Sequence, residues 1–171
     1  NLKNKEYKFR KNLLSRLEKT IIKGQFIMGN EVIELEEKLK KITGSKFCVS
    51  TSSGTDALLI SLMAIGIKKG DEVISSPFTF VSTIEVIKLL GAKPVFVDIN
   101  EKTFNLDEDL IKKKISKKTK AIIAVSLFGQ CPDFNKINKI ANKNRIFVIE
   151  DAAQSFGSKQ RSRNSCNLSS I

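Results

Sequence analysis

The sequence contains no histidine, and its three cysteines, Cys48, Cys131 and Cys166, are widely spaced without a CxxC pair. Structural zinc sites are built from such cysteine pairs and from histidines, so we expect no metal site. The odd number of cysteines also argues against a disulfide framework. The sequence therefore predicts three free, reduced thiols.

Long hydrophobic runs are also missing. No stretch of roughly 18 apolar residues is present to span a bilayer. The first residues carry several lysines, and the apolar core of a secretory signal does not follow them. We therefore expect a cytoplasmic protein without a membrane partner.

Acidic residues are scarce, with 18 Asp and Glu against 30 Lys and Arg, and the net charge is +12. Clustered lysines bind nucleic acids because they release counterions from the phosphates. Here the lysines are scattered over most segments, and the run Lys112–Lys114 falls on the polar side of a helical stretch. We interpret the charge as solvated surface and expect no nucleic-acid partner, although such a surface also attracts small anionic molecules.

A chain of 171 residues, 41% of them hydrophobic, is long enough for one domain with its own core. The first residue is Asn1 and not a methionine, and residues 164–171 have the pattern of a loop that enters a strand. We expect the sequence to be a piece of a longer protein, truncated at both ends.

Residues 1–45 are predicted to form an N-terminal helical segment. In residues 4–23 the apolar side chains recur every fourth position, which places them on one face of an amphipathic helix. The stretch 24–29 breaks this pattern, Asn30 is expected to cap a second helix, and Gly44 is expected to end it. The apolar face of the first helix consists of Phe9, Leu13, Leu17 and Ile21.

In residues 46–171 short apolar runs alternate with helical patterns, which is typical of parallel strands joined by crossover helices. We predict an α/β domain, incomplete at its C-terminus, with a mostly parallel sheet and flanking helices. The expected strands are Phe47–Ser50, Glu72–Ser75, Pro94–Asp98, Ala121–Val125 and Ile146–Ile149. The expected helices are Asp56–Ile65, Val81–Leu90, Asp107–Ile115 and Asp133–Lys143.

A parallel sheet binds ligands beyond the carboxyl ends of its strands, so the segments after the strands are candidate sites. The first reads STSSGTDALL, where small hydroxyl residues and a glycine lead into a helix. Such a turn points free backbone N–H groups at a phosphate, with Gly54 allowing close approach and Thr55 adding a hydroxyl. A plain serine-rich helix cap is an equal alternative. The pattern is neither a Walker loop nor a GxGxxG turn.

Two further segments carry candidate residues. In SSPFTF, Phe80 follows a strand and a proline turn, so its ring is placed to stack on a flat heterocycle or, as the alternative, to join the core with the other phenylalanines. In IEDAAQSFG, Asp151 closes a strand. A partly buried carboxylate there needs a cationic partner, for which a protonated pyridine nitrogen is suited, and Gln154 is placed to donate to a ring oxygen. A strand-end acid that caps the next helix is the alternative.

Taken together, these three segments and the stretches GAKPVFVDIN and KTKAIIAVSLFGQ resemble the DegT/DnrJ/EryC1/StrS family of sugar aminotransferases, which depend on pyridoxal 5'-phosphate (PLP) and have fold type I. The resemblance covers nearly the whole chain and implies the large domain of that fold. It implies that Gly54 and Thr55 bind the cofactor phosphate, Phe80 stacks on the ring, Asp151 pairs with the ring nitrogen and Gln154 approaches the ring hydroxyl. Ser126 stands where many members have a histidine.

The resemblance also implies the reaction. An amino group passes from an amino acid, glutamate by this likeness, to a keto group of a nucleotide-linked sugar, most commonly for cell-surface polysaccharide, and the enzyme is a homodimer. The lysine that forms the Schiff base with PLP is expected beyond Ile171, so no catalytic residue is predicted within the chain. Lys159 lies in a polar stretch that gives it no means of losing its charge.

This chain alone is therefore expected to be inactive. The alternatives are a pyridoxamine-dependent nucleotide-sugar dehydratase of the same family and a non-catalytic fragment. A nicotinamide-dependent oxidoreductase is disfavoured, because no glycine-rich turn stands at the required spacing before Asp98.

Overall fold

The computed structural model describes residues 7–171, with side chains from residue 9 onward. Its centre is a parallel four-stranded sheet of order β2-β1-β3-β4. Ile74 pairs with Val95 on one side and with Ile122 on the other. The strands are β1 (Glu72–Ser75), β2 (Lys93–Phe96), β3 (Thr119–Val125) and β4 (Phe147–Asp151).

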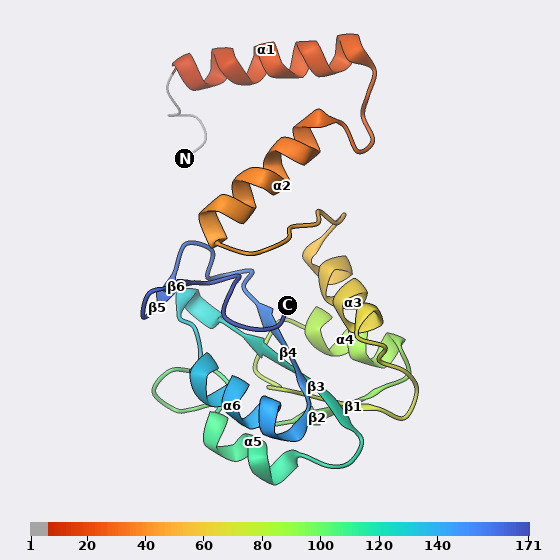
Figure 1. Cartoon of the computed structure of the whole chain (residues 1–171), viewed down its shortest axis with the longest axis vertical. Coiled ribbons are helices and arrows are strands. Elements are labelled where there is room, and N and C mark those ends of the chain that lie inside the picture. Colours follow the sequence, from red (N-terminus) through yellow and green to blue (C-terminus); the bar gives the residue numbers. More distant parts are fainter. Residues whose placement is uncertain (1–6) are drawn as a thin grey trace.

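Four helices cover the two faces of this sheet, α3 and α4 on one face and α5 and α6 on the other (Figure 1). Successive residues of β3 alternate between them: Ile122 packs in the core with α5 and α6, and Ile123 in the core with α3 and α4. Both are fully buried, as expected for a sheet covered on both faces. The helices are α3 (Gly54–Ala64), α4 (Ser82–Leu89), α5 (Glu108–Lys114) and α6 (Phe134–Asn144).

The predicted α/β class is thus confirmed, and four of the five predicted strands form. Helix starts follow capping chemistry: the Asp107 carboxylate accepts from the Asp109 N–H at 2.9 Å, and Asp133 accepts from the N–H groups of Asn135 and Lys136. The predicted boundaries of these strands and of the four sheet-covering helices lie within two residues of the observed ones, and those of Glu72–Ser75 agree at both ends.

The predicted strand Phe47–Ser50 is wrong. Residues 47–50 have an irregular backbone, and Phe47 and Val49 are exposed. A strand needs a neighbour to pair with its N–H and C=O groups, and in the described structure this segment pairs with none. Its backbone is held instead by a side chain, since the Ser50 N–H donates to Glu36 Oε1 at 2.7 Å.

The N-terminal helix pair consists of α1 (Tyr7–Lys23) and α2 (Asn30–Thr43). Both predicted helices form, and residues 4–6 of the first lie outside the described residues. Asn30 is the first helical residue and not the cap, because Gly29 occupies the N-cap position and accepts from the Val32 N–H at 3.0 Å. As predicted, α2 ends at Gly44, whose left-handed backbone has φ 77°.

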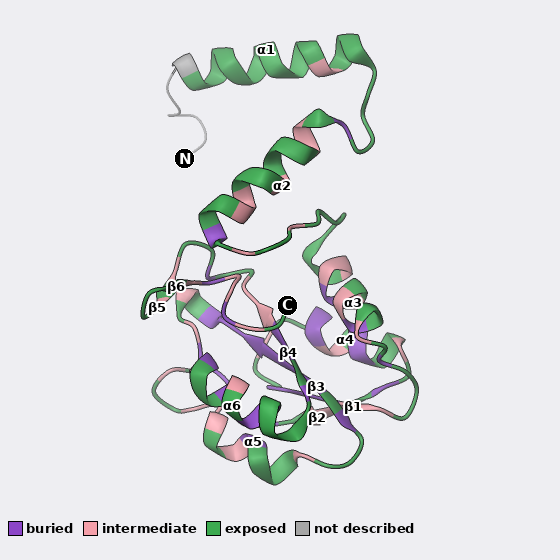
Figure 2. Ribbon diagram, viewed as in Figure 1, coloured by how far each residue is buried: buried purple, intermediate pink, exposed green. Residues whose placement is uncertain are grey.

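The helix pair projects from the sheet body and is mostly exposed (Figure 2). Arg16 of α1 contacts Glu34 of α2 at 2.5 Å. The four residues of the predicted apolar face of α1 are each about half exposed or more. No helix among residues 7–171 combines the length and apolarity needed to cross a bilayer.

After β4 the chain forms a short antiparallel ribbon of β5 (Lys159–Gln160) and β6 (Arg163–Asn164) and returns to the sheet. The Ile171 N–H donates to Val148 O at 3.3 Å, and the Glu150 N–H donates to Ile171 O at 2.9 Å, which is parallel strand pairing. Residues 165–171 otherwise form turns and irregular backbone, so of the expected strand only the pairing of Ile171 is present. Lys159 lies in the ribbon, not in a loop, and is exposed.

Candidate functional site

The five residues predicted to bind a cofactor line a single cavity of about 320 Å³ at the carboxyl edge of the sheet. Gly54 and Thr55 come from the start of α3, Phe80 from the loop after β1, and Asp151 and Gln154 from the end of β4 and the turn that follows. The other lining residues are Leu58, Thr79, Ser82, Val125 and Ala153. The strand-end segments thus meet in space although they are far apart in the sequence.

The first turn of α3 offers two free backbone donors to this cavity. The Ser53 hydroxyl accepts from the Asp56 N–H at 3.1 Å, and the Ser53 carbonyl accepts from the Ala57 N–H at 3.0 Å. Ser53 therefore caps the helix, as the alternative interpretation of this segment predicted. The cap leaves the N–H groups of Gly54 and Thr55 without an acceptor among the described residues. A β-carbon built on Gly54 meets no atom within 4 Å, so the space above this turn is open.

Asp56 lies in this turn, and two serine hydroxyls engage its carboxylate. Its carboxylate accepts from the hydroxyls of Ser52 and Ser53, and these two bonds, the one from Ser52 foremost, lower the pKa of Asp56. Asp56 is absent from the cavity lining. The positive end of the α3 dipole is therefore available to an anion on the cavity side.

The loop after β1 places an aromatic ring and a hydroxyl at the cavity. The Phe80 side chain is 70% exposed, so the alternative of an ordinary core phenylalanine does not apply. Thr79 Oγ1 is buried and has no hydrogen-bond partner in the described structure. A buried hydroxyl is normally hydrogen-bonded, so an unpaired one at a cavity wall fits a polar ligand.

The two acids at the end of β4 face opposite ways. Glu150 accepts from the Ser165 hydroxyl at 2.7 Å and from the Leu168 N–H at 3.1 Å, which fastens the returning chain to the sheet. Asp151 lines the cavity, and within the described residues its carboxylate accepts one hydrogen bond, from the Ala153 N–H at 3.2 Å, in a local turn. Turns and not a helix follow Asp151, so the helix-cap alternative does not apply, and within the described residues no cation pairs with it.

The Gln154 amide is oriented by the backbone of a neighbouring turn. The Phe128 N–H donates to Gln154 Oε1 at 2.8 Å. Because an N–H can only donate, the oxygen of the amide must face Phe128, and the NH₂ group is left for another acceptor. In the part of the chain that is described, Gln154 Nε2 has none.

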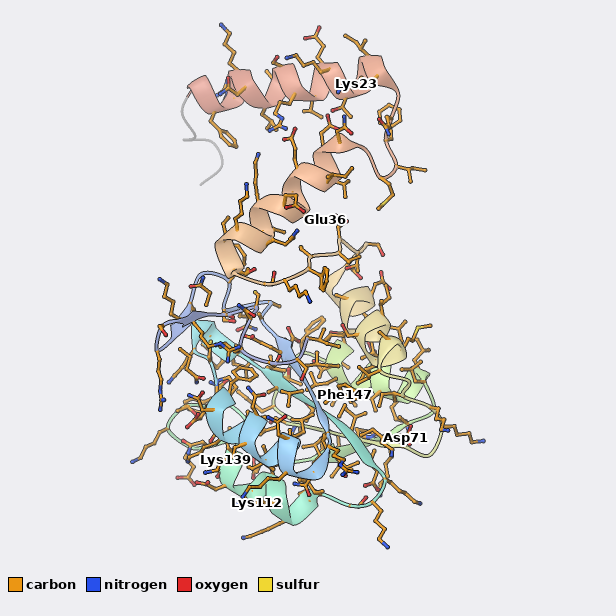
Figure 3. The ribbon with its side chains drawn as sticks, viewed as in Figure 1. Lys23, Glu36, Asp71, Lys112, Lys139 and Phe147 are labelled. Atoms are coloured by element: carbon orange, nitrogen blue, oxygen red, sulfur yellow. The ribbon has the colours of Figure 1, made fainter. Side chains whose placement is uncertain are left out.

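Among the described residues, no lysine or arginine lines the cavity. A separate cavity of about 310 Å³ between α5 and α6 is instead lined by four lysines, of which Lys112 and Lys139 are labelled in Figure 3. An anion in the first cavity would therefore be held by backbone N–H groups, hydroxyls and the helix dipole and not by side-chain cations.

Sequence reasoning missed two features of the site. Thr79 lies in SSPFTF, the segment that follows a predicted strand. Its position after a strand end was the sequence signal that could have identified it. Asn105, which holds the turn containing Phe128, is only 1% exposed and comes from a loop before α5 that no motif marks. The three cysteines lie elsewhere as free thiols, and burial raises the pKa of Cys48 and of Cys166.

Known proteins match this chain in sequence and in fold. The family model of the DegT/DnrJ/EryC1/StrS aminotransferases matches residues 8–171. A UDP-2-acetamido-2-deoxy-3-oxo-D-glucuronate aminotransferase of Pseudomonas aeruginosa is 51% identical over 170 residues, which cover 99% of this chain and 47% of that protein.

Solved structures are similar to this chain in fold. DesV of S. venezuelae, solved in complex with a ketimine intermediate, has a TM-score of 0.91 at 29% identity over 96% of this chain and 44% of its own. NtdA of Bacillus subtilis, with bound cofactor PMP, has a TM-score of 0.86 at 36% identity over 90% of this chain and 35% of its own. The chain thus spans less than half the length of these proteins, and it belongs to the DegT/DnrJ/EryC1/StrS aminotransferase family.

Proposed function

We propose that this chain is the cofactor-binding part of a PLP-dependent enzyme that transfers an amino group to a keto group of a nucleotide-linked sugar. PLP supplies a ring that accepts electrons from the substrate carbon that carries the amino group. The aminotransferases similar to this chain support the sugar substrate, and the cofactor PMP of NtdA, which is the amino form of PLP, supports the cofactor.

The observation that carries the proposal is the convergence of complementary groups on one cavity. The N–H groups of Gly54 and Thr55 suit a phosphate, the exposed ring of Phe80 suits a flat heterocycle, and the unpaired carboxylate of Asp151 suits a protonated ring nitrogen. The free NH₂ group of Gln154 suits a ring oxygen. A phosphorylated hydroxypyridine carries all four of these features.

We also propose that this chain alone does not catalyse transfer. Covalent attachment of PLP needs a lysine at the cavity, and none of the described lysines lines it. Incubation with PLP followed by borohydride is expected to label exposed lysines weakly and at many positions. One equivalent of label on a single lysine would contradict this.

The proposal extends to two partners, glutamate as the amino donor and a second copy of the protein. The exposed apolar side chains of α1 are available for contact with such a copy. Sedimentation velocity over a range of concentrations is expected to show a dimer. A monomer at every concentration would contradict this part alone and leave the cofactor site unaffected.

Pyridoxamine 5'-phosphate is the probe for the site, because its amine cannot condense with the many lysines of this chain. Equilibrium dialysis of the 171-residue chain against this compound is expected to show one saturable site. Pyridoxamine without the phosphate is expected to bind at least about tenfold more weakly, since it makes no charge-assisted bonds with the start of α3. Absence of saturable binding would contradict the proposed function.

A further inference from the structure

The turn Leu127–Gly129 between β3 and α6 is held in a strained conformation beside the cavity. Phe128 has φ 55° and ψ 23°, a left-handed backbone that is unfavourable for a bulky residue. Phe128 is 70% exposed, so burial in the core does not account for this conformation. Strain of this kind persists only where the surroundings enforce it, and it concentrates at functional sites.

Asn105 enforces the conformation from within the protein. Its side-chain oxygen accepts from the Leu127 N–H at 3.0 Å, and its side-chain nitrogen donates to Gln130 O at 2.9 Å. One buried amide thus holds both ends of the turn. From the other side, the Ser158 hydroxyl donates to Gly129 O at 2.6 Å.

The left-handed conformation of Phe128 has one structural consequence at the cavity. It presents the Phe128 N–H to Gln154 Oε1, which sets the orientation of the Gln154 amide. If the turn relaxed, the amide would lose its only described partner and rotate freely. Its NH₂ group would then be a donor in many directions instead of one.

We propose that Asn105 is a positioning residue for the cofactor: through the turn Leu127–Gly129 it holds the Gln154 amide with its NH₂ group ready to donate to the ring hydroxyl of a bound pyridoxal or pyridoxamine phosphate. This inference rests on the proposed function. It assigns Asn105 no contact with the ligand.

The test compares two ligands that differ only in the ring hydroxyl: pyridoxamine 5'-phosphate and its 3-deoxy analogue. Equilibrium dialysis gives the affinity of the 171-residue chain for each. The wild type is expected to prefer the hydroxylated compound by about tenfold, which corresponds to one charge-assisted hydrogen bond. Asn105→Leu is expected to reduce this preference to less than about threefold, and Gln154→Ala to do the same.

The preference, and not the affinity alone, separates positioning from general damage to the fold. Asn138→Leu is the matched control, because Asn138 also donates from a side-chain amide to a backbone oxygen, that of Leu168 at 2.7 Å, away from the cavity. It is expected to keep the wild-type preference. The double variant Asn105→Leu/Gln154→Ala is expected to behave as Gln154→Ala, since both changes remove the same bond.

Ser158→Ala provides a milder version should Asn105→Leu fail to fold, and it is expected to lower the preference about threefold. A wild-type preference retained in Asn105→Leu, or in Ser158→Ala where that variant carries the test, overturns the inference. So does equal binding of the two ligands by the wild type, which leaves the proposed cofactor site standing. Failure of the wild type to bind either ligand refutes the proposed function itself.

Discussion

Ile122 in β3 and Leu13 in α1 are both apolar residues of regular structure, yet Ile122 is fully buried and Leu13 is 49% exposed. In the sheet body, helices cover both faces of the sheet, and the central strand residues such as Ile122 and Ile123 pack against them. In the N-terminal helix pair, Leu13, Leu17 and Ile21 of α1 remain about half exposed or more and meet no such layer within the described residues. The contrast shows that the periodic spacing of apolar residues is enough to predict a helix. Whether the apolar face of that helix is buried depends on what packs against it.

Truncating one apolar side chain in each region tests this difference most directly. Ile122→Ala is expected to lower the free energy of unfolding by about 3 kcal/mol, because it leaves a cavity between two layers. Leu13→Ala is expected to change it by less than about 0.5 kcal/mol. Urea unfolding of the two variants measures both values, and equal losses would show that α1 packs as tightly as the sheet.

A charged residue of the sheet body is expected to matter for binding without mattering for the fold. Asp151→Asn removes a carboxylate that has one local hydrogen bond, so the free energy of unfolding is expected to change by less than about 0.5 kcal/mol. Affinity for pyridoxamine 5'-phosphate is expected to fall by about 2 kcal/mol, the scale of a hydrogen bond to a charged group. Asp109→Asn in α5 is the control, and unchanged affinity in Asp151→Asn would remove Asp151 from the site.

Gly54→Ala is also expected to separate ligand affinity from stability, with smaller changes in free energy than Asp151→Asn. The added methyl group meets no protein atom within 4 Å, and alanine favours a helix over glycine, so stability is expected to rise by up to about 1 kcal/mol. The methyl group would occupy the approach to the free N–H groups of α3, and affinity for the same ligand is expected to fall by about 1 kcal/mol. Affinity that rises together with stability would contradict the proposed phosphate position.

The smallest effect is expected between the two N-terminal helices. The Arg16 guanidinium lowers the pKa of Glu34, so the ion pair stabilises the contact of α1 with α2 above the ordinary carboxyl pKa, about 4.3. This stabilisation is lost as the pH falls through the lowered value. An acid titration followed by the NMR signals of Arg16 is expected to show the change. It should vanish in Glu34→Gln and persist in Glu18→Gln.

Most of the sheet body could be predicted from the sequence, because its apolar runs, caps and glycines act over a few residues. The Phe47–Ser50 segment has the same local signal but forms no strand, because a strand requires a neighbouring strand and none lies beside this segment in the described structure. The cavity residues could be selected because strand ends meet at one edge. Asn105 could not, because its role arises from contacts with residues more than 20 positions away, at Leu127 and Gln130.

The opposite directions of Glu150 and Asp151 have a consequence for how the gene can change. Side chains alternate along a strand, so inserting or deleting one codon just before this pair would turn each acid to the opposite face. The carboxylate that fastens the returning chain would leave Ser165 and Leu168, and the carboxylate that lines the cavity would leave the cavity face. Shifting the Glu150–Asp151 pair by an odd number of residues would therefore damage both the anchor of the returning chain and the ligand site.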